Sequence, residues 1–117
     1  MAELTIYHNP RCSKSRATLA ILRQRGTEPA VVDYQRTPPS VAELDTILER
    51  LGSEPLAITR TREKLFTELG LAESDDRPRS EWLAILHHHP KLIERPIVVH
   101  GDRAAIGRPP ENVLVIL

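Results

Sequence analysis

The sequence predicts an α/β fold in which a strand–helix–strand opening and a strand–strand–helix ending enclose a helical middle. Three observations predict this order. Short β-branched runs occur near both ends of the chain, apolar residues recur at helical spacing between them, and Gly or Pro marks most boundaries. The 117 residues suit one compact domain, and no linker divides them.

The first half of the chain opens with a strand at residues 3–7, and a proline-containing turn follows at residues 8–10. Apolar residues at helical spacing predict a helix over residues 13–25, which Gly26 ends. Residues 30–34 are brief and β-branched, so they predict a second strand.

Three helical stretches are predicted in the middle of the chain. They cover residues 41–51, 55–70 and 81–89. Ser40 and Ser80 are the expected N-caps of the first and third stretches. Gly52 and Gly70 end the first two, the second of which is broken, and Pro90 ends the third.

The last part of the chain predicts a hairpin and a helix. Residues 97–100 and 103–106 form the two strands, and residues 109–117 open with two prolines, which suit a first helical turn. The whole order is the layout of a thioredoxin-like domain, with a helical insertion at roughly residues 40–90 between its halves.

Composition excludes several classes of function. The 16 basic and 16 acidic residues give a formal net charge of zero, which argues against a general binder of nucleic acid or anionic membranes. Thirteen of the basic residues are Arg, whose planar guanidinium suits oxyanions. No apolar stretch approaches a membrane span and no signal peptide is evident, so we expect a cytoplasmic protein and, with no dedicated apolar interface, a monomer.

Cys12 is the only cysteine, so it cannot form an internal disulfide. A lone cysteine either packs as a small apolar side chain or reacts with another molecule. Here it follows a strand and a turn and precedes a helix, where free amides and the helix dipole favour a thiolate. Arg11, Lys14 and Arg16 add positive charge nearby.

Residues 12–15 have the outline of a C-x-x-C motif in which Ser15 replaces the second cysteine. An intramolecular dithiol cycle is therefore excluded, and any disulfide step at Cys12 needs a thiol from another molecule.

Residues 7–16, YHNPRCSKSR, resemble the active-site loop of the glutaredoxin-coupled arsenate reductase (ArsC) family, and are similar to its short YfgD-like branch. The resemblance continues in order along essentially the whole chain. The further matching segments are residues 26–29, 37–39, 68–72, 90–99 and 106–111.

The resemblance implies a nucleophile and three oxyanion-binding arginines. Cys12 matches the nucleophile, and Arg95 and Arg108 match two of the arginines. Arg60 matches the third in a divergent stretch where Arg62 is the alternative. Taken without the flanking motifs, an arginine is more often found in an ordinary surface salt bridge, and the motifs favour the oxyanion role for Arg95 and Arg108.

The resemblance also implies supporting residues in the loop. His8 matches the family's histidine four residues before the cysteine, and it either tunes the thiolate or packs in the turn. Asn9 either orients the loop or satisfies turn amides, and Ser15 supports the loop. Pro96 matches the cis-proline that thioredoxin-like folds keep beside the reactive cysteine.

As the resemblance implies it, Cys12 attacks arsenate, glutathione displaces the product, and glutaredoxin reduces the mixed disulfide as arsenite is released. Arginines would offset the repulsion between two anions, about 4 kcal/mol per charge pair at ~4 Å and an effective dielectric near 20. Glutathione is then a co-substrate, and we expect no bound cofactor and no nucleic-acid or membrane partner. Residues 87–89 are consecutive histidines, which diverge by about 100° on a helix and predict no metal site.

Other functions stay open on the sequence. The related Spx proteins use the same fold to bind RNA polymerase as redox-responsive regulators, although Ser15 and the arginines favour the enzyme. A thiol oxidoreductase with another substrate, or a glutathione-binding protein with little turnover, would use the same cysteine.

Overall fold

The computed structural model describes residues 3–117 of the chain. These residues divide into two compact units, one formed by residues 3–37 together with 95–117 and the other by residues 38–94. The second unit corresponds to the predicted helical insertion. That the whole chain behaves as one domain stays a prediction.

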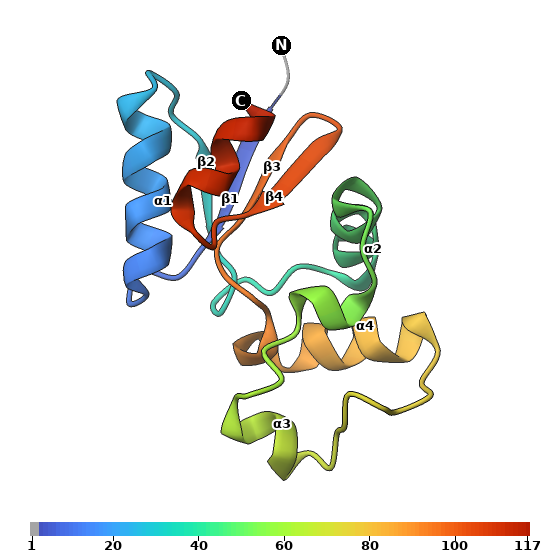
Figure 1. The fold of residues 1–117 in the computed structure, drawn as a ribbon. Helices are drawn as coiled ribbons and strands as arrows, with labels where there is room; N and C mark the ends of the chain where they lie inside the picture. Colours follow the sequence, from blue (N-terminus) through green and yellow to red (C-terminus); the bar gives the residue numbers. More distant parts are fainter. Residues whose placement is uncertain (1–2) are drawn as a thin grey trace. The chain divides into compact units, whose positions relative to one another are not determined.

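The first unit is a mixed four-stranded sheet with the strand order β2-β1-β3-β4 (Figure 1). Its strands are β1 (Leu4–His8), β2 (Ala30–Asp33), β3 (Ile97–His100) and β4 (Arg103–Ile106). Strands β1 and β2 are parallel and are joined through the helix α1 (Ser13–Gln24), whereas β3 is antiparallel to both β1 and β4. The predicted strand–helix–strand and strand–strand arrangement is therefore confirmed.

The core of the first unit lies on one face of this sheet. Ile6, Val98 and Ala105 are cross-strand partners in one row, so their side chains share a face. Leu22 of α1 packs against this row. The 3₁₀ helix η3 (Pro110–Ile116) adds Val113 and Ile116 to the same cluster. This core fixes α1, and with it the active-site loop, against the sheet.

The ends of α1 follow from its sequence. Cys12 is the N-cap residue with an extended backbone, and Gly26 lies just past the end with a φ of 81°, a value that favours glycine. The predicted last helix is present but is a 3₁₀ helix, with Pro110 in its first turn.

The regular elements of the second unit are helices, joined by loops and one isolated β-bridge between Thr59 and Ile93. Its elements are α2 (Val41–Leu51), η1 (Pro55–Ile58), α3 (Lys64–Glu68), α4 (Arg79–His88) and η2 (Pro90–Leu92). As predicted, Ser40 caps α2: its hydroxyl accepts from the Glu43 amide while the Glu43 carboxylate accepts from the Ser40 amide. Gly52 ends α2 with a φ of 65°. Phe66 and Trp82 stack with ring centroids 6.3 Å apart.

The expected N-cap at Ser80 is wrong. Helix α4 begins at Arg79, and Pro78 takes the cap position without a side-chain hydrogen bond. The carbonyl of Pro78 accepts from the amides of Glu81 and Trp82, which closes the first turn before Ser80 can act as a cap. The Arg79 guanidinium also bonds the Asp45 carboxylate of α2 at 2.7 Å, which favours Arg79 inside the helix.

Within residues 3–117, no helix combines the length and apolar character needed to cross a bilayer.

Candidate active site

The loop before α1 is shaped by Asn9. Its side-chain oxygen accepts from the Arg11 amide at 3.0 Å, and its backbone carbonyl accepts from the Cys12 amide at 3.0 Å. Asn9 therefore makes the turn that was one of its two predicted roles. The turn places Cys12 at the N-terminus of α1, where the residue is only 9% exposed.

Ser15, in the first turn of α1, links the loop to the helix by hydrogen bonds. Its hydroxyl is fully buried, accepts from the Asn9 amide at 3.0 Å and lies 2.6 Å from His8 Nδ1. One short side chain thus holds both His8 and Asn9. A second cysteine at this position would not reproduce these bonds, because a thiol is a weak donor and acceptor.

Two arginines from the C-terminal part of the first unit, residues 95–117, lie near Cys12. Arg108 Nη2 lies 3.8 Å from Cys12 Sγ, and Arg108 Nε donates to the Arg95 carbonyl at 2.8 Å. Arg95 also acts on the thiol, because its guanidinium lowers the pKa of Cys12 by hydrogen bonding and by charge. The structure therefore brings together the predicted nucleophile and two of its three predicted arginines.

The pKa of Cys12 lies below its ordinary value as the outcome of opposing effects. Burial is the largest effect and raises the pKa of the thiol. The backbone amides of Ser15 and Lys14, followed by the hydrogen bond and charge of Arg95, more than offset it by stabilising the thiolate. The expected stabilisation of the thiolate by the N-terminus of α1 therefore comes from the backbone N–H groups of Ser15 and Lys14.

The pKa of His8 is lowered, chiefly because the side chain is buried. The negative charge of Asp33 opposes this effect, while the positive charges of Arg23 and Arg16 reinforce it. Because its lowered pKa keeps the His8 imidazole neutral at neutral pH, His8 does not stabilise the Cys12 thiolate with a positive charge. The observed contact of His8 is with Ser15 rather than with sulfur, so the catalytic role of His8 stays a prediction.

Pro96 follows a cis peptide bond from Arg95, as the resemblance implied. A second cis bond, between Arg108 and Pro109, was not expected from the sequence. Both oxyanion-binding candidates therefore directly precede a cis-proline.

Gly107 is a positioning feature that the sequence analysis missed. Its amide donates to the Pro96 carbonyl at 2.9 Å. A Cβ atom at this position would lie 2.5 Å from Thr18 Oγ1 and 2.8 Å from Pro96 Cγ. Glycine thus allows the segment before Arg108 to approach α1; the only sequence signal was a glycine beside the arginine.

Arg60 belongs to the second unit. Its guanidinium pairs with Glu63 at 2.8 Å, and its backbone amide donates to the Leu92 carbonyl at 2.7 Å. Arg62 is exposed, whereas Arg60 is half-buried in this ion pair. The role of either arginine in oxyanion binding stays a prediction.

The three consecutive histidines do not converge. His87 Nδ1 bonds the Pro39 carbonyl at 2.9 Å, and His88 meets the His87 ring edge-on. Over residues 3–117, no group of three or more His, Cys, Asp or Glu side chains is arranged to hold a metal ion.

The geometry supports nucleophilic chemistry on an anion. An acidified thiol, buried amides and two guanidiniums converge at one helix N-terminus, an arrangement that stabilises both a thiolate and an approaching oxyanion. The fold and this site define a thioredoxin-like protein with a single reactive cysteine.

A model of the ArsC family matches residues 7–116, and the chain belongs to this family. The chain is 49% identical to a solved arsenate reductase from Vibrio cholerae, with a TM-score of 0.94 over 99% of this chain and 98% of that one. A structure described as a putative arsenate reductase from Yersinia pestis is 50% identical, with a TM-score of 0.92 over 97% and 100% of the two chains. These similarities confirm the thioredoxin-like fold.

Sequence relatives carry two kinds of name. A protein of Neisseria meningitidis named arsenate reductase is 43% identical over the full length of both chains. An Escherichia coli protein named YfgD and described as uncharacterized is 47% identical over 98% of this chain and 97% of its own. The predicted resemblance to a YfgD-like branch is thus confirmed.

Proposed function

We propose that this protein is a cytoplasmic arsenate reductase that uses Cys12 as its nucleophile. The observation that carries the proposal is the convergence of Arg95 and Arg108 on a thiol whose pKa is lowered. Relatives of the same length bear the name arsenate reductase, which supports arsenate as the oxyanion.

The first step is attack of the Cys12 thiolate on arsenic. A sulfur–arsenic bond forms, and an arsenate oxygen leaves as water after it is protonated. Guanidinium groups of Arg95 and Arg108 bind the remaining oxygens, which offsets the repulsion between two anions.

The second step needs an external thiol, because the described site offers Ser15 where a resolving cysteine would stand. Its thiolate attacks Cys12 Sγ and forms a disulfide. The electron pair of the sulfur–arsenic bond stays on arsenic, which falls from As(V) to As(III) and leaves as arsenite. Glutathione is the proposed thiol. Glutaredoxin then regenerates the Cys12 thiolate by thiol–disulfide exchange.

The test is arsenate-dependent NADPH oxidation by the purified protein, coupled through glutathione, glutaredoxin and glutathione reductase. Wild type should turn over, and Cys12→Ser should lose turnover while it keeps the native fold, because Ser is nearly isosteric with Cys. Turnover in Cys12→Ser would exclude the mechanism. If wild type is inactive while Cys12 remains reactive at neutral pH, arsenate is the wrong substrate and polymerase binding becomes the next experiment.

A further inference from the structure

In the second unit, one carboxylate lies between two cations. Glu63 Oε2 is 2.8 Å from Arg60 Nη1, and Glu63 Oε1 is 3.4 Å from Lys91 Nζ. The side chains of Arg60 and Glu63 are only 25% and 18% exposed, whereas Lys91 is 62% exposed. We call these three side chains the Glu63 cluster. Each oxygen of the carboxylate thus serves a different cation.

Backbone contacts hold the two cation-bearing segments beside each other. Thr59 and Ile93 form an isolated antiparallel bridge. Next to this bridge, the Arg60 amide donates to the Leu92 carbonyl at 2.7 Å. Arg60 Nη1 also donates to the Lys91 carbonyl at 3.5 Å. The backbone, and not only the carboxylate between them, therefore keeps the two cations near each other.

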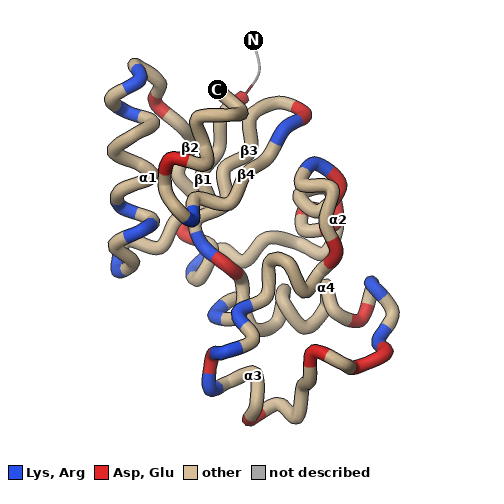
Figure 2. Tube along the Cα trace, in the orientation of Figure 1, with Lys and Arg blue, Asp and Glu red and all other residues tan. Residues whose placement is uncertain are grey.

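Positive charge exceeds negative charge around the Glu63 cluster. Residues 60–64 include three basic side chains and one acidic side chain, and Lys91 adds a further cation. Figure 2 shows blue positions where the chain enters α3. Lys64 pairs with Glu68 at 3.8 Å, but both side chains are more than half exposed, so this pair is weak. An anion with more charge than one carboxylate would therefore neutralise the cluster better.

The chemistry of the Glu63 cluster fits a tetrahedral oxyanion in place of the carboxylate. Both groups present several oxygens that share negative charge and accept charge-assisted hydrogen bonds from guanidinium and ammonium groups. Arsenate gains a second negative charge near neutral pH, as phosphate groups do. Because Glu63 is attached to the chain, its effective concentration beside the cations is high, and a singly charged anion competes with it poorly.

We propose that Glu63 occupies an oxyanion-binding position between Arg60 and Lys91 and restricts this position to doubly charged oxyanions. Such an oxyanion displaces the carboxylate and bonds both cations. Arg60 was already an expected oxyanion ligand, whereas the contacts add Lys91 and Glu63. The inference rests on the proposed function only in the choice of arsenate as the ligand.

The first test is arsenate binding at constant ionic strength, followed through the backbone amide resonances of residues 60–64 and 91. A Cys12→Ser background excludes thiol chemistry. Glu63→Gln keeps the shape of the side chain and should tighten arsenate binding about three- to fivefold, because the oxyanion no longer has to break an ion pair. Unchanged or weaker binding in Glu63→Gln would overturn the proposal.

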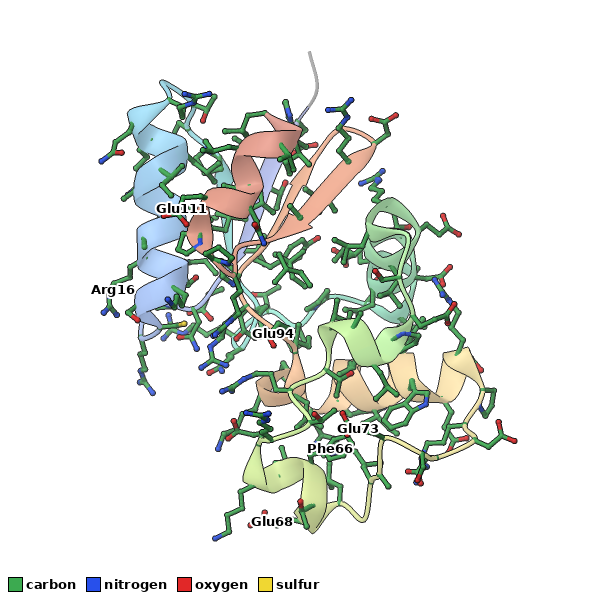
Figure 3. All side chains as sticks on the ribbon, in the orientation of Figure 1. Arg16, Phe66, Glu68, Glu73, Glu94 and Glu111 are labelled. Carbon is green, nitrogen blue, oxygen red and sulfur yellow. The ribbon has the colours of Figure 1, made fainter. Side chains whose placement is uncertain are left out.

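Glu68→Gln is the matched control, since it removes the same charge from an exposed side chain at the last position of α3 (Figure 3). Equal tightening in Glu68→Gln and Glu63→Gln would reduce the effect to general attraction and overturn the proposal. Adding Lys91→Gln to Glu63→Gln should weaken arsenate binding about threefold or more. No weakening would overturn the position between two cations.

The second test replaces arsenate with nitrate, a singly charged oxyanion. Nitrate should leave the resonances of residues 60–64 in place in wild type and shift them in Glu63→Gln. Nitrate shifts of equal size in both proteins would overturn the selective role of Glu63. Tighter arsenate binding and lost selectivity in Glu63→Gln, together with no arsenate turnover in wild type, would support the oxyanion position and overturn only the proposed reaction.

Discussion

Arg108 donates from Nε to the backbone carbonyl of Arg95 at 2.8 Å. This bond fixes the plane of the Arg108 guanidinium and leaves Nη2 directed at Cys12 Sγ, 3.8 Å away. Two arginines that are 13 residues apart are therefore coupled through one backbone oxygen. A change at Arg108 should alter the site even when the positive charge is retained.

Arg108→Lys tests this coupling. Lysine keeps the charge but lacks the rigid fork that bonds the carbonyl and the sulfur together. We expect kcat/KM for arsenate to fall about tenfold, less than the roughly 10²- to 10³-fold loss when an oriented donor is removed outright, because lysine keeps the charge. Steady-state kinetics in the coupled assay measure the change.

Arg103→Lys is the control for this substitution. Arg103 is exposed on β4 and bonds the Val115 carbonyl through Nη1, remote in sequence from the loop. Its kinetics should match wild type. Equal losses in both variants would show that Arg108 has no special place in the site.

The lowered pKa of Cys12 predicts its reactivity with pH. The thiolate reacts with iodoacetamide and the thiol does not, so the alkylation rate should be half-maximal below the ordinary thiol pKa of about 8.5. Arg95→Gln removes one stabilising charge and should move the midpoint upward. A midpoint that does not move would assign the shift to the backbone amides alone.

The same shift links pH to stability. A thiol with a folded pKa below its unfolded pKa adds stability that is present above the unfolded value and is lost as pH falls through the folded value. The difference in unfolding free energy between wild type and Cys12→Ser should therefore shrink with falling pH. Urea titrations over this window measure it, and a difference that grows would contradict the shift.

Ser15→Ala should destabilise the fold. The substitution leaves the buried Asn9 amide and His8 Nδ1 without their shared partner, which costs about 1–3 kcal/mol for buried polar groups. Urea unfolding gives the magnitude. Ser13→Ala, at an exposed first-turn position, should change stability by less than about 0.5 kcal/mol. Similar losses in the two variants would argue against the Ser15 network.

Local patterns were enough to predict most elements and the loop around Cys12. Helix α1 shows apolar periodicity and a glycine stop, and β3 and β4 flank a two-residue turn, so each carries its own signal. Ser80 failed as a cap because Pro78 takes the cap position and its carbonyl accepts from the amides of Glu81 and Trp82. The high N-cap propensity of serine does not show that the helix begins two residues earlier.

Within the site, the residue types were predictable and their connections were not. Cys12 and Arg108 are 96 residues apart, and only the resemblance placed them together before the fold was known. Ser15 was read as a substituted cysteine, whereas its burial makes it the hydrogen-bond partner of His8.

Gly107→Ala is the sharpest test of how Arg108 is placed. The added Cβ would lie 2.5 Å from Thr18 Oγ1 and 2.8 Å from Pro96 Cγ, closer than packed atoms allow. We expect a loss of about 1–3 kcal/mol in unfolding free energy, typical of overpacking. Displacement of the next residue, Arg108, should also lower kcat/KM and raise the midpoint of Cys12 alkylation.

Thr18→Ala supplies the control, since it removes both Thr18 atoms that the new Cβ would meet and leaves the Pro96 contact. On its own it deletes the hydroxyl that donates to the Lys14 carbonyl at 2.8 Å. In the double variant we expect the alanine at 107 to cost at least about 0.5 kcal/mol less than in the wild-type background, because neighbouring sites couple. Simple additivity, with normal Cys12 reactivity in Gly107→Ala, would show that Arg108 is positioned without this close approach.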